Sequence, residues 1–395
     1  MDNNKVYFPG LNGLRFFAAM AVVVTHIELV KHFMGLPNLW GNHSSNILTL
    51  TSAVKIFVFE AGGLGVYFFF VLSGFLITYL LLVEKAKTGT IAVKKFYFRR
   101  ILRIWPLYYL IVILGFFVIP YIVNGSISFS SKELNDHFGI NLFLYLIIFP
   151  NIAYAIFSPV PMISQTWSIG VEEQFYLIWP VLAKKAGNIF KMLVIVFCIM
   201  IGLKVFVLVL FKAGYGSPTL AIIKKFLAMT KIESMTIGGM GAYLLYNYKT
   251  QFKNLVYQPI VLPMCLLCIP ILILFTPPAI QDGIHLVYSV IFLFIIANVS
   301  GNPDSIIKLE NDVFNFLGKI SYSMYMYHFM LIPLVIYLMK AAGIMPSNEF
   351  IPQLVIYASV TALTILVSWL SYAYFEGWFL KLKTKYTIIK SGSKN

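Results

Sequence analysis

Charged side chains are scarce in this sequence of 395 residues. Only 11% of the residues are Asp, Glu, Lys or Arg, whereas a soluble globular protein has roughly 25%. Apolar residues make up 59%, which is more than a soluble fold can bury. The composition therefore excludes a water-soluble domain and favours a protein that lies in a lipid bilayer.

The sequence has few cysteines and lacks two common catalytic motifs. The three cysteines, Cys198, Cys265 and Cys268, lie in apolar segments, and the single C-x-x-C has no second ligand pair, so we expect neither zinc nor redox chemistry. No G-x-S-x-G or H-E-x-x-H occurs, which gives serine-hydrolase and zinc-protease chemistry no support. The glycine-rich runs 62–65 and 238–241 lack a following Lys-Ser/Thr and predict close helix packing instead of phosphate loops.

Long apolar runs dominate what is present, and they predict an all-α polytopic membrane bundle. A run of about 20 apolar residues crosses the roughly 30 Å hydrocarbon layer, and about ten such runs occur. The predicted spans are Leu14–Val30, Leu64–Val83, Ile101–Val123, 165–183, 192–211, 232–247, 256–275, 284–299, 318–340 and 351–375. A further run, 140–157, is interrupted by Pro150 and Asn151 and is expected to be a re-entrant or broken segment.

The basic residues indicate orientation. The stretch Glu84–Arg100 carries six Lys and Arg between two spans and is therefore expected in the cytoplasm. Ten spans then place both termini in the cytoplasm, with one membrane domain at 1–380 and a basic cytoplasmic tail at 381–395. The net charge of +15 is explained by this topology, so no nucleic-acid partner is expected.

Ionisable residues inside spans are costly and are candidates for function. Arg15 and His26 share the first span, about 16 Å apart at a rise of about 1.5 Å per residue. Glu172 lies in a span that runs inward from Gln165, and this arrangement predicts the same depth for Glu172 as for His26. A histidine beside a carboxylate suits a general base with an orienting partner, although a single histidine in an apolar helix is usually a packed residue.

Two other groups have both a functional and a structural interpretation. Arg100 and Arg103 share one helix face, where they would bind a phosphate-rich group or anchor the helix among lipid phosphates. His328 lies in a polar and aromatic helix that would either line a cavity or pack. Spacing alone leaves these alternatives open.

These motifs together resemble the integral-membrane acyltransferase family 3. The shared elements are Leu11-Asn12-Gly13-Leu14-Arg15 followed by His26, Ser73-Gly74-Phe75-Leu76-Ile77, Arg100-Ile-Leu-Arg103, Thr166-Trp167-Ser168-Ile169-Gly170-Val171-Glu172-Glu173-Gln174-Phe175-Tyr176, the helix from Gly318 to His328, and Phe375-Glu376. They cover nearly the whole chain in order. Asn12 departs from the Asp that the family often has at this position. Because the sequence stops roughly twenty residues after its last span, the resemblance implies a stand-alone type without an extracytoplasmic hydrolase-like domain, or an enzyme with a separate partner.

The resemblance implies an O-acyltransferase, most often an O-acetyltransferase, of the bacterial inner membrane. The donor would be cytoplasmic acetyl-CoA or another acyl-CoA, bound by Arg15, Arg100 and Arg103 without a permanent cofactor or metal. His26 would act as general base or acyl carrier, supported by Glu172. Position alone, and not the resemblance, assigns acceptor binding to Trp167 and Ser168 at the outer mouth, and to His328 if its helix lines a cavity. The expected acceptor is a hydroxyl of an envelope glycan or glycolipid, such as a capsule, exopolysaccharide or lipopolysaccharide sugar.

A secondary transporter or flippase is the alternative, because many spans with buried charges also describe a transporter. Such proteins carry paired, internally repeated broken helices. The sequence shows one break, near Pro150, and no repeat.

Overall fold

Helices make up nearly all of the computed structural model, which describes residues 5–37, 50–122, 136–157, 159–277, 280, 283–344 and 350–391. The longer helices are α1 (Leu11–Phe33), α2 (Leu50–Thr88), α3 (Val93–Phe117), α8 (Trp167–Lys185), α9 (Ile189–Lys212), α11 (Ile232–Asn247), α13 (Val261–Phe275), α14 (Ile284–Gly301), α16 (Ser321–Ala341) and α17 (Phe350–Leu370). The shorter ones are α4 (Ile119–Ile122), α6 (Phe138–Leu146), α7 (Pro150–Ile156), α10 (Pro218–Met229), α12 (Lys249–Val256), α15 (Asp312–Lys319) and α18 (Gly377–Lys383). Within the described residues, the strands are limited to the two-residue pair β1 (Lys5–Val6) and β2 (Lys390–Ser391).

The predicted all-α polytopic bundle is confirmed. Among the described helices, seven are long and apolar enough to cross a membrane, or eight when α12 and α13, which bend by 59° at their junction, are taken as one span. Helices α8 and α11 occupy the other two predicted spans. Helix α11 has 16 residues and is therefore only about 24 Å long, less than the roughly 30 Å apolar layer.

Two predicted boundaries were wrong. Helix α2 begins at Leu50, well before the predicted Leu64, because the apolar run is longer than one crossing needs and continues toward the N-terminus without a proline. The segment 212–231, predicted as a loop, contains α10. The Ser217 hydroxyl accepts a hydrogen bond from the Leu220 N–H, and Pro218 follows it at the first helical position, which is a favourable start for a helix.

The interrupted run at 140–157 is a broken segment, as expected. Helices α6 and α7 are separated by residues 147–149, where Ile148 has a left-handed φ of 61°. Pro150 begins α7, since a proline at the first helical position loses no intrahelical hydrogen bond. The amides of Asn151 and Gln174 then hydrogen-bond each other at 3.1 and 2.8 Å, which fixes α7 against α8.

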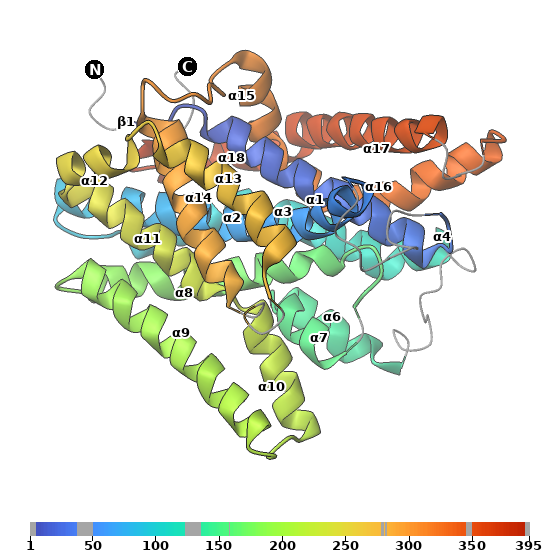
Figure 1. The fold of residues 1–395 in the computed structure, drawn as a ribbon, viewed down its shortest axis with the longest axis horizontal. Helices are drawn as coiled ribbons and strands as arrows, with labels where there is room; N and C mark the ends of the chain where they lie inside the picture. Colours follow the sequence, from blue (N-terminus) through green and yellow to red (C-terminus); the bar gives the residue numbers. More distant parts are fainter. Residues whose placement is uncertain are drawn as a thin grey trace.

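Strands β1 and β2, at the two ends of the described part of the chain, lie at one end of the bundle, which we call the terminal face (Figure 1). Strand β1 pairs in parallel with β2, and the Tyr7 hydroxyl donates a hydrogen bond to Glu310. Burial and the neighbouring Glu310 carboxylate raise the pKa of Tyr7. Glu310 also accepts a 2.7 Å hydrogen bond from the Gly10 N–H at the start of α1.

Glycines let other helices approach α2 closely, as the glycine-rich runs predicted. A Cβ atom at Gly74 would overlap the backbone oxygen of Met235 on α11, and one at Gly238 would overlap the backbone oxygen of Val71. Small residues at such crossings allow backbone-to-backbone packing in membrane proteins. Helix α2 is therefore held directly between α1 and α11 at the centre of the bundle.

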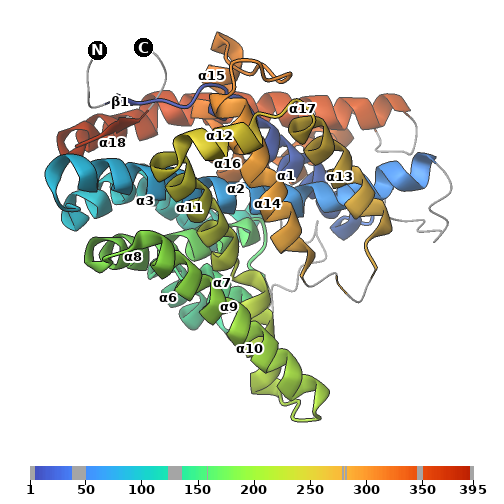
Figure 2. The same cartoon turned by 60° about the vertical axis from the view of Figure 1, so that its left-hand side comes forward.

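Helices α9 and α10 diverge from the rest of the bundle as a V-shaped hairpin (Figures 1 and 2). A buried ionic group anchors this hairpin. Lys204 on α9 bonds to the Glu233 carboxylate on α11 and donates a 2.8 Å hydrogen bond to the Thr230 carbonyl. His285 Nε2 on α14 lies 2.7 Å from the same carboxylate, so this group joins three helices.

Candidate active site

His26 and His328 form a direct pair inside the bundle. His26 Nδ1 on α1 lies 2.7 Å from His328 Nε2 on α16, and the two rings are nearly parallel with centroids 5.0 Å apart. Phe329 stacks on His26 at a centroid distance of 4.7 Å. His328 is wholly buried at 0% exposure, whereas His26 keeps part of its surface exposed. The sequence placed both histidines in the site but did not predict that they touch.

The predicted direct pairing of His26 with Glu172 is not what the structure shows. Glu172 accepts hydrogen bonds from Ser73 at 3.1 Å and from Tyr176 at 2.6 Å. It interacts electrostatically with Arg15, eleven positions before His26 on α1, so it belongs to the Arg15 level of the bundle. The hydrogen-bond partner of His26 in the described residues is His328.

The depth prediction failed because α8 begins inside the bundle and not at its surface. The Gln165 side-chain amide donates to the Met326 carbonyl at 3.0 Å, and the Ser168 hydroxyl lies 2.7 Å from that of Tyr325. The start of α8 is therefore level with the part of α16 that precedes His328. Glu172 lies further along α8, toward the terminal face.

Trp167 and Ser168, the predicted acceptor residues, differ in their surroundings. Ser168 is 5% exposed, and its hydroxyl is already bonded to Tyr325 and to the Gln165 carbonyl at 3.2 Å. Its contacts fix α8 against α16, which argues against substrate contact by this hydroxyl. Trp167 is partly exposed, with its ring edge-on to Phe70 at 6.1 Å.

Arg15, Arg100 and Arg103 lie together toward the terminal face, as predicted from the sequence. The three charges interact with one another, and all three side chains are partly exposed. The Arg100 guanidinium lies over the rings of Phe96 and Tyr176, at 5.4 and 5.2 Å. Within the described ranges, none of the three arginines has a carboxylate in salt-bridge distance. Partly buried arginines that form no salt bridge with a carboxylate have the chemistry to bind an anion.

Lys383 is a fourth member of this cluster that sequence reasoning missed. It lies on α18, in the segment predicted to be a cytoplasmic tail, and its charge interacts with Arg103, Arg100 and Arg15. The segment is tied to α3 because Arg99 donates to the Tyr386 carbonyl at 2.9 Å and Phe98 stacks on the Tyr386 ring at 4.9 Å. No salt bridge of Lys383 occurs among the residues that the structure describes. Its distance along the chain from the arginines gave no signal of this proximity.

Two more carboxylates border the cluster. Glu173 accepts a 2.9 Å hydrogen bond from the Trp105 indole, and its other oxygen is buried without a hydrogen-bond partner in the described part of the chain. Glu376 lies in a π-helical turn, 371–376, and accepts hydrogen bonds from Ser323 at 2.7 Å and Ser371 at 2.9 Å. Turns of this type are frequent at functional sites. The Phe375-Glu376 motif was the sequence signal for this residue.

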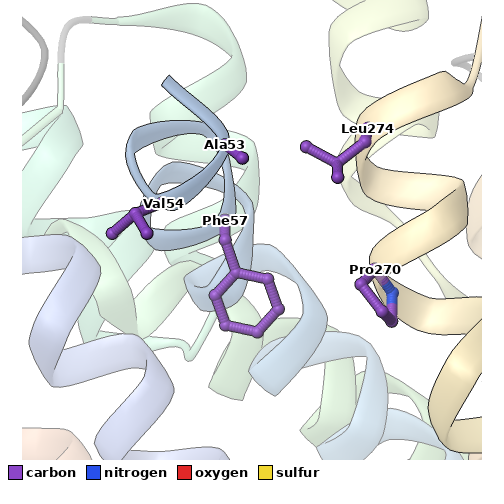
Figure 3. Close-up of a pocket in the computed structure, with 5 residues that line it drawn as sticks. All are labelled: Ala53, Val54, Phe57, Pro270 and Leu274. Carbon is purple, nitrogen blue, oxygen red and sulfur yellow. The ribbon is translucent and has the colours of Figure 1, made fainter. Parts of the chain in front are cut away.

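A separate apolar pocket of about 230 Å³ lies between the start of α2 and α13 (Figure 3). It is lined by Ala53, Val54, Phe57, Pro270 and Leu274. None of these side chains is polar, so the pocket offers no group for chemistry. Its lining suits lipid hydrocarbon, and it is distinct from the histidine pair and the cationic cluster.

Comparisons with known proteins agree with this arrangement. A family model described as an acyltransferase domain matches residues 8–373. O-acetyltransferase OatA of Staphylococcus aureus strain NCTC 8325 is 27% identical over 390 residues, which cover 94% of this chain and 57% of that protein. A protein of strain COL, whose name also assigns it as an O-acetyltransferase, is 29% identical over 395 residues, which cover 95% of this chain and 58% of that protein. The chain thus spans little more than half the length of these relatives. No solved structure gives a significant match.

Proposed function

Because the chain belongs to acyltransferase family 3, we propose that it is an integral-membrane O-acetyltransferase that transfers an acetyl group from acetyl-CoA to a hydroxyl of a cell-envelope glycan. The observation that carries this proposal is the arrangement on α1. This helix holds His26 in the bundle interior and Arg15 in the cationic cluster, about 16 Å apart along the helix axis. The site thus has a reactive centre and a separate anion-binding centre.

The cationic cluster suits the nucleotide end of acyl-CoA. Forked guanidinium groups match phosphate geometry, and a partly desolvated setting strengthens the attraction. The cluster holds four positive charges, on Arg15, Arg100, Arg103 and Lys383. Three carboxylates lie beside it, Glu172, Glu173 and Glu376. The sum is a net positive charge, which favours the binding of a polyanion. The terminal face would then be cytoplasmic, as the positive-inside rule predicts, and the membrane would be the bacterial inner membrane.

His26 would act as the general base. Its Nε2 takes the proton of the acceptor hydroxyl while the hydroxyl oxygen attacks the thioester carbonyl carbon. The carbon–sulfur bond then breaks, and the departing thiolate takes the proton back from His26 Nε2, so that the products are the acetyl ester and CoA-SH. The partial exposure of His26 supports this role, because the base must reach substrate.

The proposed acceptor is supported by the family resemblance and by the position of Trp167. Trp167 is partly exposed at the level where α8 begins, away from the terminal face, and offers an apolar ring to a sugar. An acceptor that arrives from the outer side would meet the thioester at His26. In this arrangement, the acyl group crosses the bundle and CoA remains on the cytoplasmic side.

The test is the transfer of radiolabelled acetyl from acetyl-CoA into envelope glycans by membranes that contain the protein. We expect His26→Gln to lower the transfer by about 10²- to 10⁴-fold, the usual contribution of a general base. We expect Arg103→Gln to raise the KM for acetyl-CoA. His32→Gln, an exposed position on α1, and Lys95→Gln, an exposed position on α3, are the matched controls. Transfer that does not depend on His26, or movement of unmodified glycan without any label, would contradict the proposal.

A further inference from the structure

We propose that His328 is a positioning residue that fixes the tautomer of His26, leaving the His26 Nε2 lone pair free as the base. This inference rests on the proposed function and deepens it. Two contacts carry it. His328 Nδ1 lies 3.1 Å from the Met324 carbonyl oxygen, and His328 Nε2 lies 2.7 Å from His26 Nδ1.

These two contacts determine where the protons are. A carbonyl oxygen only accepts, so His328 Nδ1 carries a hydrogen and donates it to Met324. In the neutral ring, His328 Nε2 then has a lone pair and accepts. His26 Nδ1 must therefore carry the hydrogen that lies between the two rings, and in its own neutral ring Nε2 is unprotonated.

The same hydrogen bond suits the reaction. When His26 Nε2 takes a proton, His26 becomes a cation and its Nδ1–H still donates to His328 Nε2. No group has to turn as the charge develops, and the hydrogen bond becomes charge-assisted and stronger. In this respect His328 does what a carboxylate does beside the histidine of a serine-protease triad.

Burial separates the roles of the two rings. His328 is at 0% exposure, and both of its nitrogens are occupied by protein, so it has no atom for a substrate. His26 is partly exposed, and only its Nδ1 has a hydrogen-bond partner in the described residues. The sequence-based assignment of His328 to acceptor binding is thereby replaced by a role that acts through His26.

Two amide substitutions at position 328 test this inference because they mimic different ring nitrogens. The amide of His328→Gln ends near the place of Nε2 and can accept from His26. The amide of His328→Asn is one bond shorter, ends near the place of Nδ1, and does not reach His26. The two variants are alike in polarity and burial, so a loss of folding would affect both.

We expect His328→Gln to keep kcat within about threefold of wild type and His328→Asn to lower it by on the order of 10- to 100-fold, part of the range of a general base. The KM for acetyl-CoA stays unchanged in both. Equal kcat values for the two variants, or an effect mainly on KM, would overturn the positioning role. Loss of activity in both, with intact folding, would also overturn it.

A second measurement does not depend on activity. The ¹⁵N spectrum of histidine-labelled protein, with His26 assigned by its loss in His26→Gln, reports which ring nitrogen is protonated. We expect protonated Nδ1 in the wild type and in His328→Gln, and a shift toward protonated Nε2 in His328→Asn. An Nε2-protonated wild type contradicts the inference. If wild-type membranes transfer no acetyl, the proposed function fails, and this spectrum still decides the tautomer.

Discussion

Replacing Glu172 by Gln separates two roles for this carboxylate. If Glu172 oriented His26, as the sequence suggested, the substitution would slow the chemical step. In the structure, Glu172 lies instead among the arginines, where its negative charge opposes a bound polyanion. Gln keeps the size of the side chain, and the hydroxyls of Ser73 and Tyr176 can still hydrogen-bond to it.

The size of the effect follows from the geometry. The Arg100 guanidinium is 5.2 Å from the Tyr176 ring centre, and the Tyr176 hydroxyl is 2.6 Å from the Glu172 carboxylate. These contacts place the carboxylate within about 11 Å of the Arg100 guanidinium. For a phosphate taken at about 10 Å from the carboxylate, two unit charges repel by about 1.7 kcal/mol at an effective dielectric constant of about 20. Because water and salt screen part of this repulsion, we expect the KM for acetyl-CoA to fall by about three- to 15-fold.

Steady-state kinetics on purified protein, with acetyl-CoA varied at low and at high salt, measure this effect. We expect kcat to stay within about twofold of wild type, and the gain in KM to shrink at high salt. Tyr176→Phe is the matched control, since it removes a hydrogen bond of Glu172 but keeps the charge, and it should not lower KM. A fall in kcat of a hundredfold with unchanged KM would refute the reasoning and restore Glu172 as the partner of His26.

Two other substitutions test the cluster and the packing. Lys383→Gln should weaken the binding of CoA several-fold but leave the binding of phosphate-free pantetheine unchanged, as measured by calorimetry. Lys381→Gln, at an exposed position on the same helix, is the control and should change neither affinity. Gly74→Ala and Gly238→Ala should each lower stability by about 1–3 kcal/mol, because the new methyl groups meet backbone atoms that cannot turn aside. Gly63 on α2 has open space around it, so Gly63→Ala should leave stability unchanged or raise it. The stabilities are measured by thermal unfolding in detergent. Equal melting temperatures for the three variants would contradict the packing argument.

The bundle was predictable from sequence because apolar run length directly reflects membrane thickness. A criterion based on the length of apolar runs does not detect short or amphipathic helices. Helix α10 has lysines among its apolar residues and fell below any span-length signal. The start of α2 at Leu50 was missed for a related reason, since a run longer than the apolar layer has no boundary that hydropathy can locate.

The sequence predicted which candidate residues lie near each other better than it predicted their direct contacts. Arg15, Arg100 and Arg103 were expected at the same end of neighbouring spans, and their charges do interact there. Glu172 was placed by counting residues from an assumed membrane surface, whereas α8 starts at the level of Tyr325. The depth at which α8 begins depends on the broken segment that precedes it, and no local sequence pattern encodes this depth. Lys383 was missed because tertiary folding of the last residues brings it back to α3.

Helix α1 joins the two halves of the site, and its ends are fixed. At the start, the Gly10 N–H donates to Glu310, and the Asn12 amide donates to Asn315 at 3.0 Å. Beyond His26, a fully buried ion pair joins Lys31 to Glu28 at 2.6 Å, and Tyr357 on α17 donates to Glu28. The separation of the cationic cluster from the base is therefore set by a rigid helix and not by loops.

A fixed separation requires a donor of matching length. We expect an acetyl-CoA analogue that lacks the β-alanine unit of the pantetheine arm to bind nearly as well as acetyl-CoA, because its phosphates still reach the arginines. Its thioester would stop short of His26, so kcat should fall by 100-fold or more, as misplacement of reacting groups by a few ångströms predicts. Competition binding measures the affinity of each donor, and transfer assays measure kcat with each donor. Normal kcat with the shortened donor would mean that the thioester reacts nearer the arginines, and the base would then have to be sought there.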